Sequence, residues 1–81
     1  MVVIAYDISD EKRLRKVAKF LESRGIRAQR SIFELELSLA KAKKLLKELE
    51  EIINQEEDKC FLYSIKTKED LQGDTSIERI V

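Results

Sequence analysis

The chain is predicted to form one small α+β domain, because its 81 residues leave room for a single hydrophobic core. Apolar residues recur at the helical spacing of three and four over residues 11–24 and 39–53. β-branched and aromatic residues gather in residues 2–6, 26–37 and 60–65, which is typical of strands. This order of segments indicates a sheet with helices packed on it.

The first strand leads into a basic helix. Residues 2–6 are a continuous apolar run, which predicts a strand buried on both faces. The run ends at Asp7, and either Ser9 or Asp10 can accept backbone N–H groups and so begin the helix. Gly25 is expected to end that helix in a left-handed conformation, which glycine adopts without steric cost.

The stretch after the first helix allows two interpretations. Residues 26–37 are either one long strand or two short strands that turn near Ser31, and no glycine, proline or asparagine marks a turn there. Ser38 is a suitable N-cap for the second helix. Residues 60–65 show little alternation, which predicts another central strand.

Two short strands in the middle stretch would give the order βαββαβ of a ferredoxin-like domain, whereas one long strand would give a simpler three-stranded α/β unit. We predict the ferredoxin-like fold for residues 1–66 and a C-terminal loop and strand for residues 67–81. The additional short strand, residues 77–81, has no obvious mate. Helices would cover one face of the sheet and leave the other bare. Because the core is small and the lone Cys60 cannot form an internal disulfide, we expect a homodimer that the C-terminal segment completes.

The composition excludes several classes of enzyme. The chain has no histidine, which rules out Ser/His and Cys/His nucleophiles and disfavours a zinc site. Its two glycines, Gly25 and Gly73, cannot build a nucleotide-binding loop. Cys60 is expected to pack in a strand as a small hydrophobe, and carboxylates with a divalent cation are the chemistry that remains. The single cysteine, and the lack of a signal peptide or of an apolar run of roughly 18 residues, predict a cytoplasmic protein.

The formal net charge is zero, but the charges are unevenly distributed along the chain. Residues 1–30 hold eight Lys/Arg and four Asp/Glu, whereas residues 31–81 hold eight and twelve. This distribution suggests a local basic surface for phosphates. The alternative is that the charges form solvated helix faces, and charge alone favours that alternative.

Asp7 is the best candidate for chemistry, because it follows a buried strand and precedes a helix N-terminus. One carboxylate is a poor Mg²⁺ site, but two Asp7 side chains that meet across a two-fold axis would suffice. The alternative is that Asp7 only caps or precedes the helix. Tyr6 is expected in the core, on the opposite face of the strand. Phe33 is expected there too, unless it faces out beside Arg27 and Arg30 as a base-stacking platform.

Two motifs at a characteristic spacing resemble those of a known family. They are Tyr6-Asp7-Ile8-Ser9-Asp10, which opens the basic helix, and Arg27-Ala28-Gln29-Arg30-Ser31-Ile32-Phe33-Glu34, which follows Gly25. Together with the length and the order of elements, they resemble the small CRISPR-associated adaptation proteins of the Cas2 family, over nearly the whole chain.

The resemblance implies a symmetric homodimer whose C-terminal strand crosses to the partner, which would give residues 77–81 a mate. It implies a role in CRISPR spacer acquisition, as an adaptor that bridges the Cas1 integrase and prespacer DNA. It also implies a metal-dependent endonuclease activity, with Mg²⁺ or another divalent cation, on RNA or double-stranded DNA. By similarity Asp7 is the catalytic metal ligand, shared with its symmetry mate. The residues expected to support the site or to contact nucleic acid are Tyr6, Arg13, Lys16, Arg27, Arg30, Ser31 and Phe33.

The resemblance therefore implies two functions, an adaptor and an endonuclease, and the adaptor is favoured as the cellular role. An adaptor would keep Cas1 binding after loss of the Asp7 carboxylate, whereas an enzyme would lose cleavage. Arg27 or Arg30 would offset phosphate charge in the enzyme. The alternative outside this family is a ferredoxin-like toxin or regulatory nucleic-acid-binding module, which would need neither motif.

Overall fold

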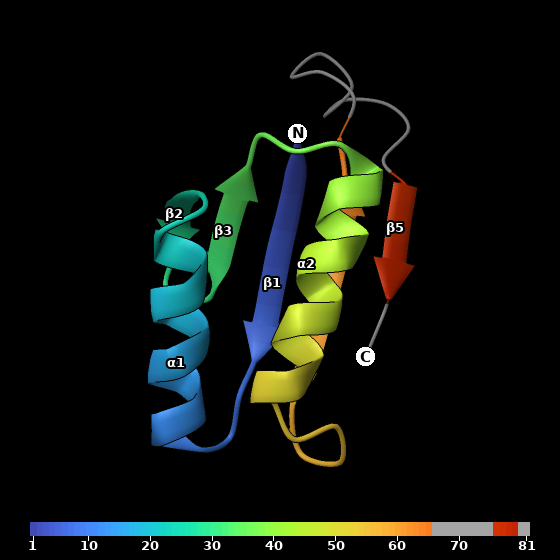
Figure 1. Ribbon diagram of the computed structural model, residues 1–81. Helices are drawn as coiled ribbons and strands as arrows, with labels where there is room; N and C mark the ends of the chain where they lie inside the picture. Colours follow the sequence, from blue (N-terminus) through green and yellow to red (C-terminus); the bar gives the residue numbers. More distant parts are fainter. Residues whose placement is uncertain (66–75, 80–81) are drawn as a thin grey trace.

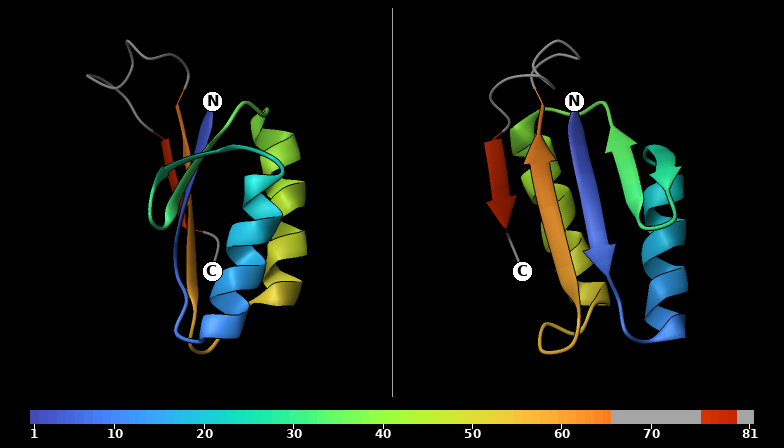
Figure 2. Two further views of the ribbon diagram at one scale, coloured as in Figure 1. Left: turned by 90° about the vertical axis from the view of Figure 1, so that its left-hand side faces the viewer. Right: turned by 180° about the vertical axis from the view of Figure 1, so that it is seen from behind.

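The computed structural model describes residues 1–65 and the backbone of residues 76–79. Five antiparallel strands form one sheet in the order β2-β3-β1-β4-β5, and two helices cover one of its faces (Figures 1 and 2). The elements are β1 (Val2–Asp7), α1 (Glu11–Glu22), β2 (Ile26–Gln29), β3 (Ile32–Leu35), α2 (Leu39–Ile52), β4 (Lys59–Ser64) and β5 (Ser76–Arg79). The first six elements follow the βαββαβ order, so the ferredoxin-like fold is confirmed.

The middle stretch forms two strands. β2 and β3 are joined by a turn at Arg30 and Ser31, and their register shifts at Ala28, between Arg27 and Gln29. The turn lacks the glycine or asparagine that usually marks a tight hairpin, which explains why the sequence left both interpretations open.

The two helix starts lie where capping residues were expected. Asp10 caps α1 by accepting the backbone N–H of Arg13, and Ser38 caps α2 by accepting that of Lys41. Ser9, the other candidate for the first cap, makes a different contact that is described below.

Gly25 does not have the conformation that was expected. None of the residues described has a positive φ, so the prediction of a left-handed terminator is wrong. A Cβ at this position would overlap the carbonyl oxygen of Glu34 and lie 2.8 Å from Cγ of Leu35. The glycine is therefore required because the chain after α1 passes directly against β3.

The core lies between the sheet and the helices. β1 contributes Val2, Ile4 and Tyr6 to it, whereas Val3 and Ala5 point to the uncovered face and are half-buried. The expectation that this strand is buried on both faces is therefore wrong for a single chain, because the second face has no covering layer. The same alternation holds in β4, where Cys60 and Leu62 face the helices.

The C-terminal strand has a mate in the same chain. β5 pairs with β4 in an antiparallel register, with Tyr63 opposite Ile77. The predicted loop after residue 66, and residues 80 and 81 of the predicted terminal strand, lie outside the described residues. Exchange of this strand between two copies stays a prediction. Neither helix in the described part of the chain has the length and hydropathy needed to cross a membrane.

Candidate metal and nucleic-acid site

Asp7 is the last residue of β1, and its side chain is exposed. Because side chains alternate along a strand, it points to the uncovered face while Tyr6 points to the helices. Lys59 of β4 lies directly opposite it in the strand register. In the part of the chain that the structure describes, no three acidic or cysteine side chains gather to hold a metal ion. An exposed single carboxylate suits an ion such as Mg²⁺ that keeps most of its waters, provided that a second ligand comes from another molecule.

A second group of predicted residues lines a hollow of about 170 Å³ on the helical side of the sheet, between α1 and the β2–β3 turn. The three cations that line it are all arginines, one from the exposed face of α1 and two from the β2–β3 hairpin. The lining residues are Tyr6, Leu14, Arg15, Ala18, Arg27, Arg30 and Ser31. Such a cluster of guanidinium groups is suited to bind phosphate.

Arg27 is held in place within this hollow. Its Nη2 lies 3.2 Å from Oε1 of Glu22, and its guanidinium lies 5.2 Å from the centroid of the Phe33 ring. The Tyr6 hydroxyl donates a hydrogen bond of 3.5 Å to the carbonyl of Arg30. Burial raises the pKa of Tyr6, although the nearby charge of Arg27 offsets part of the rise. The tyrosine is thus a neutral hydroxyl at neutral pH and joins β1 to the turn.

Phe33 belongs to the core. Its side chain is fully buried and stacks on Tyr6 with the ring centroids 6.3 Å apart. A base cannot reach it, so the alternative of an exposed stacking platform is wrong. Cys60 is buried as well, as expected, and burial raises the pKa of its thiol to about 12.

Asp58 is the important residue that the sequence did not reveal. Its carboxylate is buried, and it accepts hydrogen bonds from the backbone N–H of Ser9 at 3.0 Å and of Asn54 at 2.8 Å. Arg13 donates to it from Nε at 2.8 Å and from Nη2 at 3.3 Å. Burial alone would raise the pKa of Asp58, but these hydrogen bonds, that of Arg13 first, bring it well below the usual value.

This contact network changes the environment of Arg13. Besides Asp58, its guanidinium contacts Glu57, with Nη2 3.0 Å from Oε2. Two carboxylates therefore balance the positive charge that was expected to face nucleic acid. Lys16 is exposed on α1. Asp58 lies in a polar stretch that resembles an ordinary loop, and its partner is 45 residues away in the sequence; no local pattern could have joined the two.

A family model described as CRISPR associated protein Cas2 matches residues 1–72. The chain belongs to the Cas2 family. It is 39% identical over 83 residues to a CRISPR-associated endoribonuclease Cas2 of Synechocystis, a match that spans 98% of this chain and 90% of that protein. It is 40% identical over 62 residues to a CRISPR-associated endoribonuclease Cas2 of Thermus thermophilus, spanning 76% of this chain and 66% of that one. A Rhodospirillum rubrum relative is 44% identical over 61 residues, and this chain spans about half of it (49%).

Two solved structures have the same fold. The crystal structure of Streptococcus pyogenes Cas2 matches with a TM-score of 0.74 and 30% identity, over 93% of this chain and 96% of that one. A hypothetical protein from Thermus thermophilus matches with a TM-score of 0.76 and 28% identity, over 95% of each chain. Family membership disfavours the alternative of a toxin or regulatory module outside CRISPR systems.

The residues that the Cas2 resemblance indicated do not form one cluster in the single chain. Asp7 lies on the uncovered face of the sheet, whereas Tyr6, Arg27, Arg30 and Ser31 line the hollow on the helical face. The hollow also includes Arg15, which the sequence analysis did not single out. Its signal was weak, because it is one of several cations on α1.

Proposed function

We propose that this chain works as a homodimeric adaptor in CRISPR spacer acquisition, which joins the Cas1 integrase to prespacer DNA. The uncovered face of the sheet carries this proposal. Val3 and Ala5 lie on it, and the strand register places Tyr63 beside Val3 and both Ile32 and Phe61 beside Ala5. All five side chains are only half-buried in the single chain.

An apolar sheet surface of this kind is stabilised by burial against another surface. A second copy offers the same surface, and contact between identical surfaces gives a two-fold dimer. The dimer would stand as a rigid spacer with the helices on its outer sides. The hollows beside the β2–β3 turns would then lie on both halves, where each could bind the phosphate backbone of a duplex.

The second proposed activity is metal-dependent cleavage of RNA or double-stranded DNA. Asp7 supports it, because it is exposed at the end of the same uncovered face. In a two-fold dimer the two Asp7 carboxylates would hold one divalent cation. Bound there, Mg²⁺ would stabilise charge on a scissile phosphate and make a water molecule more acidic. Arg15 and Arg30 have no carboxylate partner among residues 1–65. Each can therefore attract another phosphate of the nucleic-acid strand that is cleaved.

One pair of assays tests both activities. The wild type and Asp7→Ala are compared in spacer integration with Cas1 from the same locus, and in Mg²⁺-dependent cleavage of labelled RNA and duplex DNA. We expect integration to persist in Asp7→Ala while cleavage is lost, with the dimer intact by light scattering. Lys59→Ala, which changes the residue opposite Asp7, controls for general disturbance of the strand ends. A wild type that is monomeric and does not support integration would contradict the adaptor proposal. Equal cleavage by both proteins would contradict the role of Asp7.

A further inference from the structure

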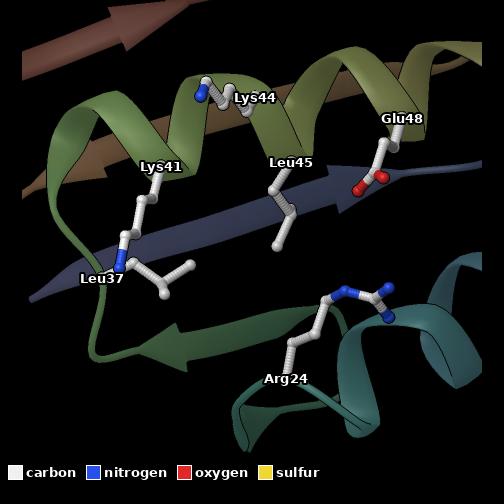
Figure 3. Close-up of a pocket in the computed structure, with 6 residues that line it drawn as sticks. All are labelled: Arg24, Leu37, Lys41, Lys44, Leu45 and Glu48. Carbon is white, nitrogen blue, oxygen red and sulfur yellow. The ribbon is translucent and has the colours of Figure 1, made fainter.

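A larger hollow lies on the helical side, at the opposite end of the molecule from Asp7. Its volume is about 350 Å³, and it is lined by residues from the segment after α1, from the segment before α2 and from α2 itself (Figure 3). This volume is near the lower end of the range of ligand pockets, roughly 300 to 1,000 Å³. The lining residues are Arg24, Leu37, Lys41, Lys44, Leu45 and Glu48.

The floor of this hollow is apolar and its rim is mostly cationic. Leu37 and Leu45 form the apolar part, and Leu45 extends from α2 towards the segment that carries Arg24 (Figure 3). Lys41 and Lys44 are exposed on α2, and no ion pair joins either of them to another side chain within residues 1–65. The one carboxylate at the rim is that of Glu48.

The guanidinium of Arg24 is held in position by contacts within the chain itself. Its guanidinium lies 3.8 Å from the centroid of the Phe20 ring. Its Nη1 donates hydrogen bonds of 2.8 Å to the carbonyl of Phe20 and of 2.8 Å to Oγ of Ser23. These contacts occupy Nη1 and leave Nη2 and Nε to donate to a ligand. A preorganised guanidinium loses little side-chain freedom when it binds a carboxylate.

The charge order of α2 gives an independent reason to expect an anionic ligand. The N-terminal half of this helix carries Lys41, Lys43 and Lys44, with no acidic residue in its first turn, and the last turn has no basic residue. This order is the reverse of the one that the helix dipole favours. In contrast, α1 has Glu11 in its first turn and Lys19 in its last. Two of these cations, Lys41 and Lys44, line the hollow, and their position in the N-terminal half of α2 is explained if they bind an anion.

We propose that this hollow docks an acidic peptide segment of another protein, one with an apolar side chain flanked by carboxylates. The apolar side chain would pack on Leu37 and Leu45, and the carboxylates would bind Arg24, Lys41 and Lys44. A nucleic acid fits less well, because its backbone offers no apolar group to the leucines. The site is separate from Asp7, so the proposal does not depend on the adaptor or nuclease activity.

The probe is a short fluorescein-labelled peptide with leucines at positions i and i+4 and glutamates at the others. Two control peptides carry serine in place of the leucines or glutamine in place of the glutamates, and a short duplex DNA is the fourth ligand. Binding to the full chain is followed by fluorescence anisotropy and by amide chemical shifts. We expect the first peptide to bind most tightly, with shifts concentrated at Arg24, Leu37 and Leu45.

Charge variants on α2 provide the matched comparison. Lys44→Glu is expected to weaken the peptide about tenfold, since it reverses one charge beside the bound carboxylates. Lys47→Glu makes the same change on the same helix at a residue that does not line the hollow, and is expected to weaken binding less than Lys44→Glu, because its exposed charge interacts with the ligand only through solvent. Circular dichroism confirms that both variants fold.

Several results would overturn the proposal. The first is that the peptide does not bind at about 1 mM, which corresponds to a negligible affinity. The second is that the serine control binds as tightly as the leucine peptide, which would mean that charge alone is recognised. Equal losses in Lys44→Glu and Lys47→Glu would show that the hollow is not the site. Tighter binding of the duplex than of the peptide, with the same amide shifts, would assign the surface to nucleic acid.

Discussion

Replacement of Asp58 by asparagine tests the contact that joins the β1–α1 loop to the loop before β4. The carboxylate is buried and accepts from Ser9, Arg13 and Asn54. Both oxygens accept: Oδ1 from the backbone N–H and Oγ of Ser9 and from Arg13 Nη2, and Oδ2 from Arg13 Nε and the backbone N–H of Asn54. The amide of asparagine has the shape of the carboxylate but only one acceptor oxygen. Its NH₂ group must therefore take the place of the other oxygen and face the N–H groups that donate to it.

The expected cost follows from the donors left without an acceptor. If the amide oxygen keeps the Oδ2 position, the Ser9 N–H and Arg13 Nη2 lose an acceptor. If it takes the Oδ1 position, the Asn54 N–H and Arg13 Nε lose theirs. A buried donor without a partner costs about 1 to 3 kcal/mol, and loss of the charge weakens the contact that remains. We therefore expect Asp58→Asn to lower the free energy of unfolding by about 3 kcal/mol. For a domain of this size that corresponds to a fall in Tm of roughly 12 to 24 °C.

The assay is urea unfolding of the wild type and Asp58→Asn at equal protein concentration, followed by circular dichroism. Glu57→Gln, which alters the exposed neighbour that contacts the same arginine, is the matched control and is expected to cost less than about 1 kcal/mol. Because the native pKa of Asp58 lies well below its ordinary value of 3.8, its contribution is present above that pH and decreases as the pH falls below it. The difference between the two proteins should therefore narrow in acid. A cost below about 1 kcal/mol at neutral pH, or a difference that grows in acid, would refute the reasoning.

Three further predictions concern other parts of the fold. Gly25→Ala should lower the free energy of unfolding by about 1 to 3 kcal/mol in urea, because the added Cβ overlaps the Glu34 carbonyl; an unchanged midpoint would contradict this. The thiol of Cys60 should resist a thiol reagent at about pH 8 in the native protein and react at once in denaturant, since burial raises its pKa to about 12 and blocks access; rapid native reaction would show that β4 opens readily. Ala5→Arg places a charge on the uncovered face and should convert a dimer to a monomer by light scattering, and a variant that stays dimeric would place the interface elsewhere.

The sequence predicted the elements well where the signals are local. The caps at Asp10 and Ser38 depend on side chains that bond to a backbone group three residues ahead, so the pattern and the structure agree. The helix stripes are local for the same reason, and the structure buries Val17 and Leu21 of α1 as expected.

The sequence predictions were wrong where contacts between residues distant in the sequence determine the structure. Gly25 looked like a helix terminator, but its role is set by β3, which passes against it. The run in β1 looked buried on both faces, but an apolar run does not say what covers the second face. The burial of Asp58 could not be predicted locally, because its ion-pair partner Arg13 lies 45 residues away in the sequence and only the Asn54 N–H is nearby. The sequence analysis named candidate site residues one by one. Only the structure shows that they lie on two different faces of the sheet.

The strand β2 forms one edge of the sheet and disfavours the addition of a further strand at that edge. It is a short, exposed edge whose register breaks at Ala28, and it carries the cations Arg27 and, just after it, Arg30. A shifted register and charge both discourage a neighbouring chain from adding a strand there. The opposite edge is formed by β5, whose outer backbone has no strand beside it in the sheet as described. Strand addition from another molecule is thus steered to one side of the domain, so an assembly built this way has a defined polarity.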